Sequence, residues 1–386
     1  MATGAALKLA GESCSTCPAR GGKCVPPEPP PAGGRAQLAV VGEFPRGADL
    51  ENGAPLSGSG GRMLLRGLKT IGLRRHDIHW TNAILCKPPV DAKGLAGAAK
   101  HCAERLRAEL AASSASVVVP LGPLGLKGVL ASKSKPQILK WRGSVSTVQW
   151  PADPGELPQG PVLARSTFVL PTLDPGFVLR APKWGPVLET DIARVGRVLE
   201  HGFTAPEDEP GRELLIAKTR AQLSAALSRL GNDVSFDVET VGLGPTSTSL
   251  VCFGLSDGRL TVVVPWSKAS NGLEAFWLDP VSVAAEVSTA LATRTAITHN
   301  GPAFDHIVAA RYGLRIAAWD DTLLASHALA GHMPKNLAHV VTQHLDVPPW
   351  KQLEDRGASI ERLWVYNGRD CLYTILAWFE MRKAMT

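Results

Sequence analysis

The stretch Val-Ser-Phe-Asp-Val-Glu-Thr at residues 234–240 decides how the C-terminal half of this chain is read. It begins as an apolar strand, and Gly242 follows shortly after its last carboxylate. Asp237 and Glu239 have the spacing that points two side chains of a strand to the same face. We therefore predict a strand over residues 234–239 whose end presents two carboxylates, which is a natural place for a metal site.

Two further acidic residues close short segments downstream. Asp305 ends His-Asn-Gly-Pro-Ala-Phe-Asp, and Asp370 ends Tyr-Asn-Gly-Arg-Asp. Tyr366 precedes Asp370 by four residues, so both side chains would share one face of a helix. Carboxylates from three separated segments can converge on two divalent cations, which clamp the attacking and leaving oxygens of a phosphodiester. The C-terminal half is thus a candidate metal-dependent nuclease in which Tyr366 orients or deprotonates the attacking water.

The surrounding patterns predict an α/β protein. In the N-terminal half, strands expected at residues 38–43, 78–86, 117–122 and 168–171 alternate with helices at 61–72 and 95–112, which indicates an α/β layered fold. In the C-terminal half, short turns join strands expected at 234–239, 250–256 and 260–265 into an antiparallel meander. Helices are expected there at 212–230, 281–292, 305–312, 322–329 and 363–385.

Length and composition favour two globular domains. The chain has 386 residues, 45% of them hydrophobic and 20% charged. A Gly- and Pro-containing segment at 202–211 looks like a linker, which gives domains over 1–201 and 212–386. The sequence has no apolar run of membrane-spanning length and no proper signal peptide, so we expect a cytoplasmic protein. A net charge of +6 suits a polyanionic partner.

The cysteines are unevenly distributed. Five of the seven lie in the first 102 residues, which favours a local metal or cluster site over a disulfide framework. The candidate ligands are Cys14 and Cys17, in a Cys-x-x-Cys pair, together with Cys86 and Cys102. Four thiolates without histidine suit zinc and a 4Fe–4S cluster about equally.

The C-terminal half resembles the DEDD (DnaQ-like) 3′–5′ exonucleases that carry tyrosine in the last motif, above all the proofreading domains of family A DNA polymerases. The similarity rests on the three acidic segments and on Trp-Asp-Asp-Thr-Leu-Leu-Ala-Ser at 319–326, over residues 231–386. It implies a ribonuclease H-like mixed sheet, with Tyr366 positioning the water and Asn300 helping to hold the strand. The two Mg²⁺ or Mn²⁺ ions would be bound by Asp237, Glu239, Asp305 and Asp370. By the same resemblance, Asp320 and Asp321 belong to a structural segment.

The N-terminal half is similar to the family 4 iron–sulfur uracil-DNA glycosylases, with an α/β/α fold over residues 9–195. The motifs are Cys-x-x-Cys, Val-Val-Gly-Glu-Phe-Pro at 40–45, Thr81-Asn82, Val-Val-Pro-Leu-Gly at 118–122 and Leu-Pro-Thr-Leu-Asp-Pro-Gly at 170–176. The resemblance implies that Cys14, Cys17, Cys86 and Cys102 ligate a 4Fe–4S cluster. Cys24 is then a spare thiol or an alternative ligand.

The pocket of the glycosylase-like half departs from the family pattern at three positions. Leu56 stands where the family has a base-stacking phenylalanine, Asp174 where it has a histidine, and Arg46 where it has a glycine. Glu43 and Asn82 are retained, and Asn82 could read a base edge. An aspartate would oppose stabilisation of a developing uracil anion. We therefore expect a retained fold and cluster that serve DNA binding or attachment.

A basic segment follows the third strand and fits contact with phosphate. It comprises Lys127, Lys133, Lys135, Lys140 and Arg142 around Trp141.

Together these observations predict a 3′–5′ DNA exonuclease. We expect no attached polymerase domain after the last helix and a separate DNA polymerase as the partner, in a bacterial or phage-infected cell. One alternative is a bifunctional repair enzyme that also excises uracil. The other is a non-catalytic DNA-binding or assembly protein.

Overall fold

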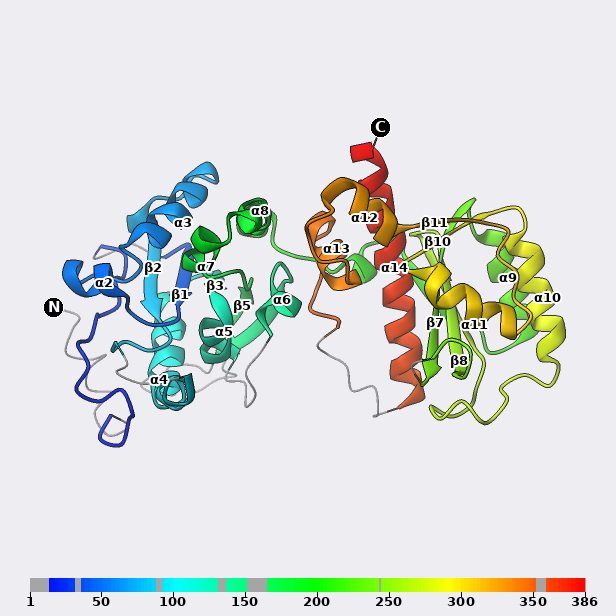
Figure 1. The fold of residues 1–386 in the computed structure, drawn as a ribbon, viewed down its shortest axis with the longest axis horizontal. Coiled ribbons are helices and arrows are strands. Elements are labelled where there is room, and N and C mark those ends of the chain that lie inside the picture. Colours follow the sequence, from blue (N-terminus) through cyan, green and yellow to red (C-terminus); the bar gives the residue numbers. More distant parts are fainter. Residues whose placement is uncertain are drawn as a thin grey trace, which may run out of the picture. The chain divides into compact units, whose positions relative to one another are not determined.

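A computed structural model of the chain describes residues 14–31, 36–87, 92–130, 137–150, 165–242, 244–351 and 359–385. The chain divides into two compact units, Met1–Phe203 and Thr204–Thr386, each with its own sheet (Figure 1). Within the described residues, no helix is both long enough and apolar enough to cross a membrane.

The sheet of the N-terminal unit has the strand order β2-β1-β3-β5-β4. Its strands are β1 (Leu38–Gly42), β2 (Ile78–Asn82), β3 (Val117–Pro120), β4 (Ser146–Trp150) and β5 (Arg165–Val169). All neighbours pair in parallel except β4, which is antiparallel to β5. The α/β fold and the four predicted strands are confirmed, whereas β4 was not predicted. Because successive strands are added on opposite sides of β1, ligands are expected at the carboxyl ends of β1 and β3.

Helices and a tightly packed apolar core cover this sheet. The helices are α2 (Gly47–Asn52), α3 (Ser59–Thr70), α4 (Ala92–Ser113), α5 (Gly122–Leu130), α6 (Ile138–Trp141), α7 (Pro175–Arg180) and α8 (Gly185–His201). Leu106 and Leu110 of α4 pack with Val41 and Val118 from the sheet, and all four side chains are buried. This packing fixes the strand ends that carry the pocket residues.

One part of the basic segment proved to be structural. Arg142 is buried and forms an ion pair with Asp191, its Nε lying 3.1 Å from Oδ2. Thr172 donates a hydrogen bond of 2.6 Å to the same carboxylate. The prediction that Arg142 contacts phosphate was therefore wrong, because its charge is neutralised inside the protein. Lys133 and Lys135 lie outside the described residues.

The sheet of the C-terminal unit is mixed, with the order β11-β10-β7-β8-β9-β6. Its strands are β6 (Glu213–Ile216), β7 (Asp233–Val241), β8 (Ser249–Ser256), β9 (Leu260–Pro265), β10 (Thr295–Thr298) and β11 (Ala318–Asp321). Strands β7, β8 and β9 form the predicted antiparallel meander. Strands β6, β10 and β11 pair in parallel with β9, β7 and β10.

The single helix predicted over 212–230 was wrong in its first part. Residues Glu213–Ile216 form β6, and the helix α9 runs only over Arg220–Arg229. Thr219 begins the helix, because its hydroxyl accepts a hydrogen bond of 3.2 Å from the Gln222 amide. Pairing with β9 holds the four residues of β6 extended.

Helices cover both faces of the second sheet (Figure 1). On one face, α9, α10 (Pro280–Leu291) and α11 (Asp305–Arg311) pack against Val234, Phe236 and Val238 of β7. On the other face lie α12 (Thr322–Ala330), α13 (Leu337–His344) and α14 (Ile360–Met385). Because side chains alternate along a strand, the polar residues of β7 face α14.

Gly254 allows α14 to approach β8 closely. It pairs with Asp237 across the two strands. A Cβ atom at this position would lie 2.5 Å from Asn367 Oδ1 and 2.6 Å from Cys371 Sγ. The missing side chain therefore brings residues 367–371 of the helix over the carboxylates of β7.

Candidate functional site

The four predicted acids come together at the end of β7. Ligand atoms of Asp237, Glu239 and Asp370 lie within 4.8 Å of one another. Asp305, at the start of α11, accepts a hydrogen bond of 3.0 Å at Oδ1 from the amide of Val238, the residue between the two strand acids. Residues separated by more than a hundred positions in the sequence thus form one acidic cluster, defined here as Asp237, Glu239, Asp305 and Asp370.

Asn367 holds the first of these acids. Its side-chain amide donates 2.7 Å to Asp237 Oδ2 and 3.3 Å to the Asp237 carbonyl oxygen. The residue is fully buried. The sequence analysis missed this role, although Asn367 stands between Tyr366 and Asp370 on the same helix. Its hydrogen bonds fix how the Asp237 carboxylate faces the cluster.

Two residues of the loop after α13 hold Asp370. The Trp350 indole nitrogen donates to Oδ1 over 2.6 Å, and the Lys351 ammonium lies 2.5 Å from Oδ2. The same ammonium donates to the Tyr366 hydroxyl and sits 4.6 Å from the centre of the Tyr366 ring. Trp350 and Lys351 were also missed, since no motif or spacing in the sequence links them to the acids.

Charge repulsion and burial shift the pKa values of the cluster. Burial, and then the neighbouring charges of Asp305, Asp370 and Glu239, raise the pKa of Asp237 well above its ordinary value. Burial likewise raises the pKa of Asp305 to about 7, although the Val238 amide opposes the shift. Burial lowers the pKa of Lys351, but the negative charges of the adjacent carboxylates raise it by more. The pKa of the ammonium is therefore above its ordinary value. A cation placed among these four carboxylates would therefore stabilise their charged forms.

The donor set of the acidic cluster fits Mg²⁺ or Mn²⁺. Each of the four residues offers carboxylate oxygens, which are the ligands that these hard cations prefer. The Oδ2 of Asp321, by contrast, accepts hydrogen bonds from the Thr298 hydroxyl and the Gly301 amide, and its Oδ1 caps α12. Asp321 is thus occupied as a structural residue, in keeping with the sequence-based expectation. Asn300 is exposed, with a left-handed backbone, at the turn that leads to Asp305.

In the N-terminal unit, two of the predicted pocket residues meet at Gly42, the last residue of β1. A Cβ atom there would lie 2.2 Å from Asn82 Oδ1 and 3.4 Å from Leu56 Cδ2. Asn82 is 1% exposed, and neither polar atom of its side chain has a hydrogen-bond partner among the described residues. A buried amide without partners is costly unless a ligand satisfies it.

The other two pocket residues meet at Gly122, directly after β3. A Cβ atom there would lie 2.9 Å from Glu43 Oε1 and 3.4 Å from Asp174 Cβ. Asp174 also caps α7, and Arg46 lies 3.4 Å from its Oδ1 and 3.7 Å from Glu43 Oε2. The Arg46 guanidinium thus partly offsets the charges of Asp174 and Glu43. These residues meet at the ends of β1 and β3, between which the strand order of the sheet reverses.

The N-terminal cysteines also gather, but two of them form a disulfide, although we expected free ligands and no disulfide. Cys17, Cys86 and Cys102 pack against one apolar cluster. Burial, and then the neighbouring thiols of Cys102 and Cys17, raise the pKa of Cys14. Cys86, which we assigned to the cluster ligands, forms a disulfide with Cys24, because an antiparallel bridge sets the two residues side by side. Cys14, Cys17 and Cys102 are free thiols. If the disulfide were reduced, Cys86 would add a fourth thiol, and this set would fit a sulfur-ligated cluster.

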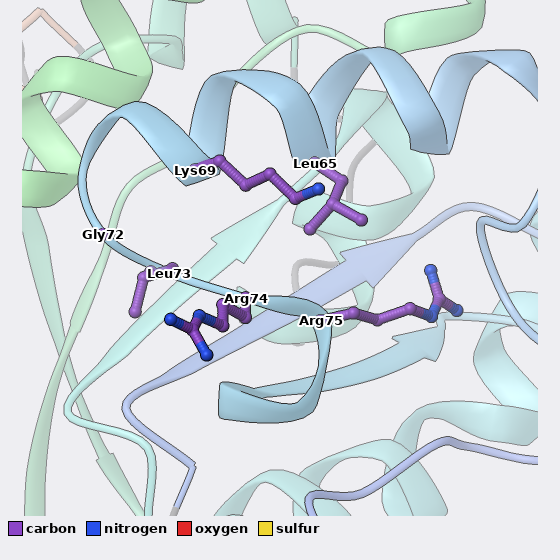
Figure 2. A pocket seen from close by; sticks show the side chains of 6 residues that line it. All are labelled: Leu65, Lys69, Gly72, Leu73, Arg74 and Arg75. Atoms are coloured by element: carbon purple, nitrogen blue, oxygen red, sulfur yellow. The ribbon is translucent and has the colours of Figure 1, made fainter.

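A basic depression lies in the N-terminal unit. Figure 2 shows its lining residues, Leu65, Lys69, Gly72, Leu73, Arg74 and Arg75, between the end of α3 and the start of β2. This is the end of β2 opposite to Asn82. Arg75 forms an ion pair with Glu28 and donates to the Pro55 carbonyl oxygen. None of the predicted site residues lines the depression.

The N-terminal half is similar in sequence to a known protein family. Residues 30–191 match the family model of the uracil DNA glycosylase superfamily. The type-4 uracil-DNA glycosylase of Archaeoglobus fulgidus is 28% identical over 168 residues, which cover 42% of this chain and 77% of that protein. The corresponding protein of Thermotoga maritima is 27% identical over 144 residues, with 37% and 67% covered. The predicted resemblance of this half is confirmed.

Solved structures match the C-terminal half. NrnC of Brucella melitensis is 18% identical, with 45% of this chain and 82% of that chain covered and a TM-score of 0.34. RNase D of Escherichia coli, an exoribonuclease, is 16% identical, with 45% and 46% covered and a TM-score of 0.32.

The raised pKa of Asp305 predicts how stability depends on pH. An ordinary aspartate has a pKa of 3.8, whereas Asp305 in the folded protein has a pKa of about 7. Between these values the folded state retains a proton that the unfolded state has lost. The contribution of Asp305 to the free energy of unfolding is therefore full below the lower value and is lost as the pH rises through the higher one.

Urea unfolding in EDTA across this pH range measures the effect. Asp305→Asn should flatten the fall in stability, whereas Asp320→Asn, at an exposed position outside the cluster, should leave it unchanged. An equally steep fall in the Asp305 variant would contradict the assignment.

Proposed function

We propose that the C-terminal unit is a metal-dependent 3′–5′ DNA exonuclease that acts as the proofreading subunit of a separate DNA polymerase. The observation that carries the proposal is the meeting of Asp237, Glu239 and Asp370 within 4.8 Å, with the Tyr366 hydroxyl beside them. Four carboxylates and a tyrosine in one place are the groups that two-cation phosphodiester hydrolysis needs.

Asp237, Glu239, Asp305 and Asp370 would hold two Mg²⁺ or Mn²⁺ ions. Such ions supply a nucleophile at neutral pH and neutralise charge on the attacking and leaving oxygens. The other residues act by positioning. Asn367 fixes Asp237, Trp350 fixes one oxygen of Asp370, and the Tyr366 hydroxyl orients the attacking water. The reaction would release nucleoside monophosphates from a 3′ end.

The direction of cleavage, the DNA substrate and the polymerase partner rest on the resemblance of the C-terminal motifs to proofreading domains. The net charge of +6 is compatible with a nucleic acid partner. We propose that the N-terminal unit binds DNA or docks the enzyme, with a 4Fe–4S cluster that stabilises its fold. The unpartnered amide of Asn82 beside Gly42 supports contact with a nucleobase edge in that unit.

Uracil excision by the N-terminal pocket is the second candidate. Asn82 favours it, because its free donor and acceptor lie at the end of β2 in a glycosylase-like unit. Asp174 disfavours it, because an anion stands where charge develops on the leaving base, and the half-exposed Arg46 offsets that charge only in part.

Cleavage of a 5′-labelled oligonucleotide with a 3′ mismatch tests the exonuclease. With Mg²⁺ or Mn²⁺ the wild-type protein should give a ladder that shortens stepwise from the 3′ end. Asp237→Ala should slow the cleavage by at least about 100-fold, since removing a group that merely orients a metal ligand already costs roughly 10–100-fold.

Asp320→Ala is the matched control, because it removes an exposed carboxylate outside the acidic cluster and should keep full activity. Absence of cleavage by well-folded, cluster-loaded wild-type protein would refute the proposal and favour the binding-protein alternative.

Iron content and the visible absorption of the purified protein test the cluster. Cys102→Ser should abolish iron binding, because it removes a free thiol that lies among the other cysteines. Cys24→Ser should retain the cluster and leave Cys86 free to bind it. Equal iron loss in both variants would instead make Cys24 a ligand, and no iron in anaerobically prepared wild-type protein would exclude the cluster.

A further inference from the structure

Lys351 binds one oxygen of the Asp370 carboxylate in the acidic cluster. Both oxygens of this carboxylate are engaged by protein groups, since Trp350 donates to Oδ1 and Lys351 to Oδ2. The Trp350 indole can stay in place when a cation binds, because it uses the other oxygen. The Lys351 ammonium uses Oδ2 and also interacts with the charges of Asp237 and Glu239, the acids with which Asp370 would share a cation.

The same ammonium also engages the tyrosine. It donates to the Tyr366 hydroxyl and lies over the Tyr366 ring. One positive charge therefore holds two groups that the proposed reaction requires. An ammonium is a compact point charge on a flexible stem, and it interacts with a cluster of carboxylates much as a metal ion does.

The Lys351 side chain is partly exposed, and the residue before it is held in place. The lysine side chain is 20% exposed, so part of it reaches solvent. The preceding residue, Trp350, is anchored by its bond to Asp370 and by an edge-on contact with Tyr373, whose ring centre is 4.7 Å away. Trp350 is thus held at two contacts, whereas the ammonium of Lys351 sits at the end of a long, flexible stem.

We propose that Lys351 is a built-in competitor of the catalytic cations. A divalent cation binds Asp370 Oδ2 only when the ammonium leaves it, and the same movement frees the Tyr366 hydroxyl for the attacking water. Lys351 thereby raises the cation concentration at which the site fills and couples cation loading to release of the tyrosine. This inference rests on the proposed nuclease function and adds a regulatory residue to that site.

Binding of Mn²⁺ alone to the full chain, measured by calorimetry without DNA, tests the inference independently of activity. Lys351→Met keeps most of the side-chain volume and removes the charge, so it should bind Mn²⁺ at least about fivefold more tightly than wild type, the lower end of typical coupling between two sites. Lys351→Gln should show the same direction and serves if the methionine variant fails to fold.

Lys335→Met is the matched control. It removes one positive charge from the same unit, but Lys335 donates to the carbonyl oxygens of Ala330 and Met333 and touches none of the four acids. Its Mn²⁺ affinity should equal that of wild type. A gain as large as that of the Lys351 variants would mean that only net charge matters, and would overturn the competition.

Different results of this binding experiment would refute the competition by Lys351 and the proposed cation site. If wild type binds Mn²⁺ through Asp237 and both Lys351 variants bind it equally or more weakly, the competition is refuted and the nuclease proposal stands. If neither wild type nor any Lys351 variant binds Mn²⁺, the cation site itself is refuted, and the inference about Lys351 falls with it.

Discussion

The C-terminal site depends on the mutual repulsion of carboxylates that the fold forces together. Asp237 and Glu239 project from one strand, and Asp370 reaches them from a helix that Gly254 admits to close contact. Burial and like charge raise the pKa values of Asp237 and Asp305, so keeping these acids charged in the folded chain costs free energy. A cation relieves that cost, whether it is a divalent ion or the ammonium of Lys351. The same electrostatic demand thus explains both the expected metal binding and the position of the lysine.

In both units, glycines in or next to the sheet leave room for the polar groups of the site. In the N-terminal unit, glycines at the carboxyl ends of β1 and β3 leave room for Asn82 and Glu43. In the C-terminal unit, a glycine on β8 leaves room for α14. In each case a missing side chain determines how close the polar groups come. Two of the residues that depart from the glycosylase pattern, Arg46 and Asp174, lie next to each other, and Arg46 also contacts Glu43.

The sequence predicted those features that depend on local periodicity. The strand period placed Asp237 and Glu239 on one face, and the helical period placed Tyr366 with Asp370. It did not predict Trp350 and Lys351, because their position depends on how a loop packs against Tyr373. The four residues of β6 were misread, since so short an apolar run is extended only through its pairing with β9. Cysteine spacing likewise could not show that a backbone bridge sets Cys24 opposite Cys86.

The most direct test of the central claim is the anomalous scattering of Mn²⁺ in a crystal of the wild-type protein. The account predicts manganese bound by Asp237, Glu239, Asp305 and Asp370, with the Lys351 ammonium displaced from Asp370. Manganese absent from these four carboxylates at saturating concentration, with Lys351 still bound to Asp370, would contradict it.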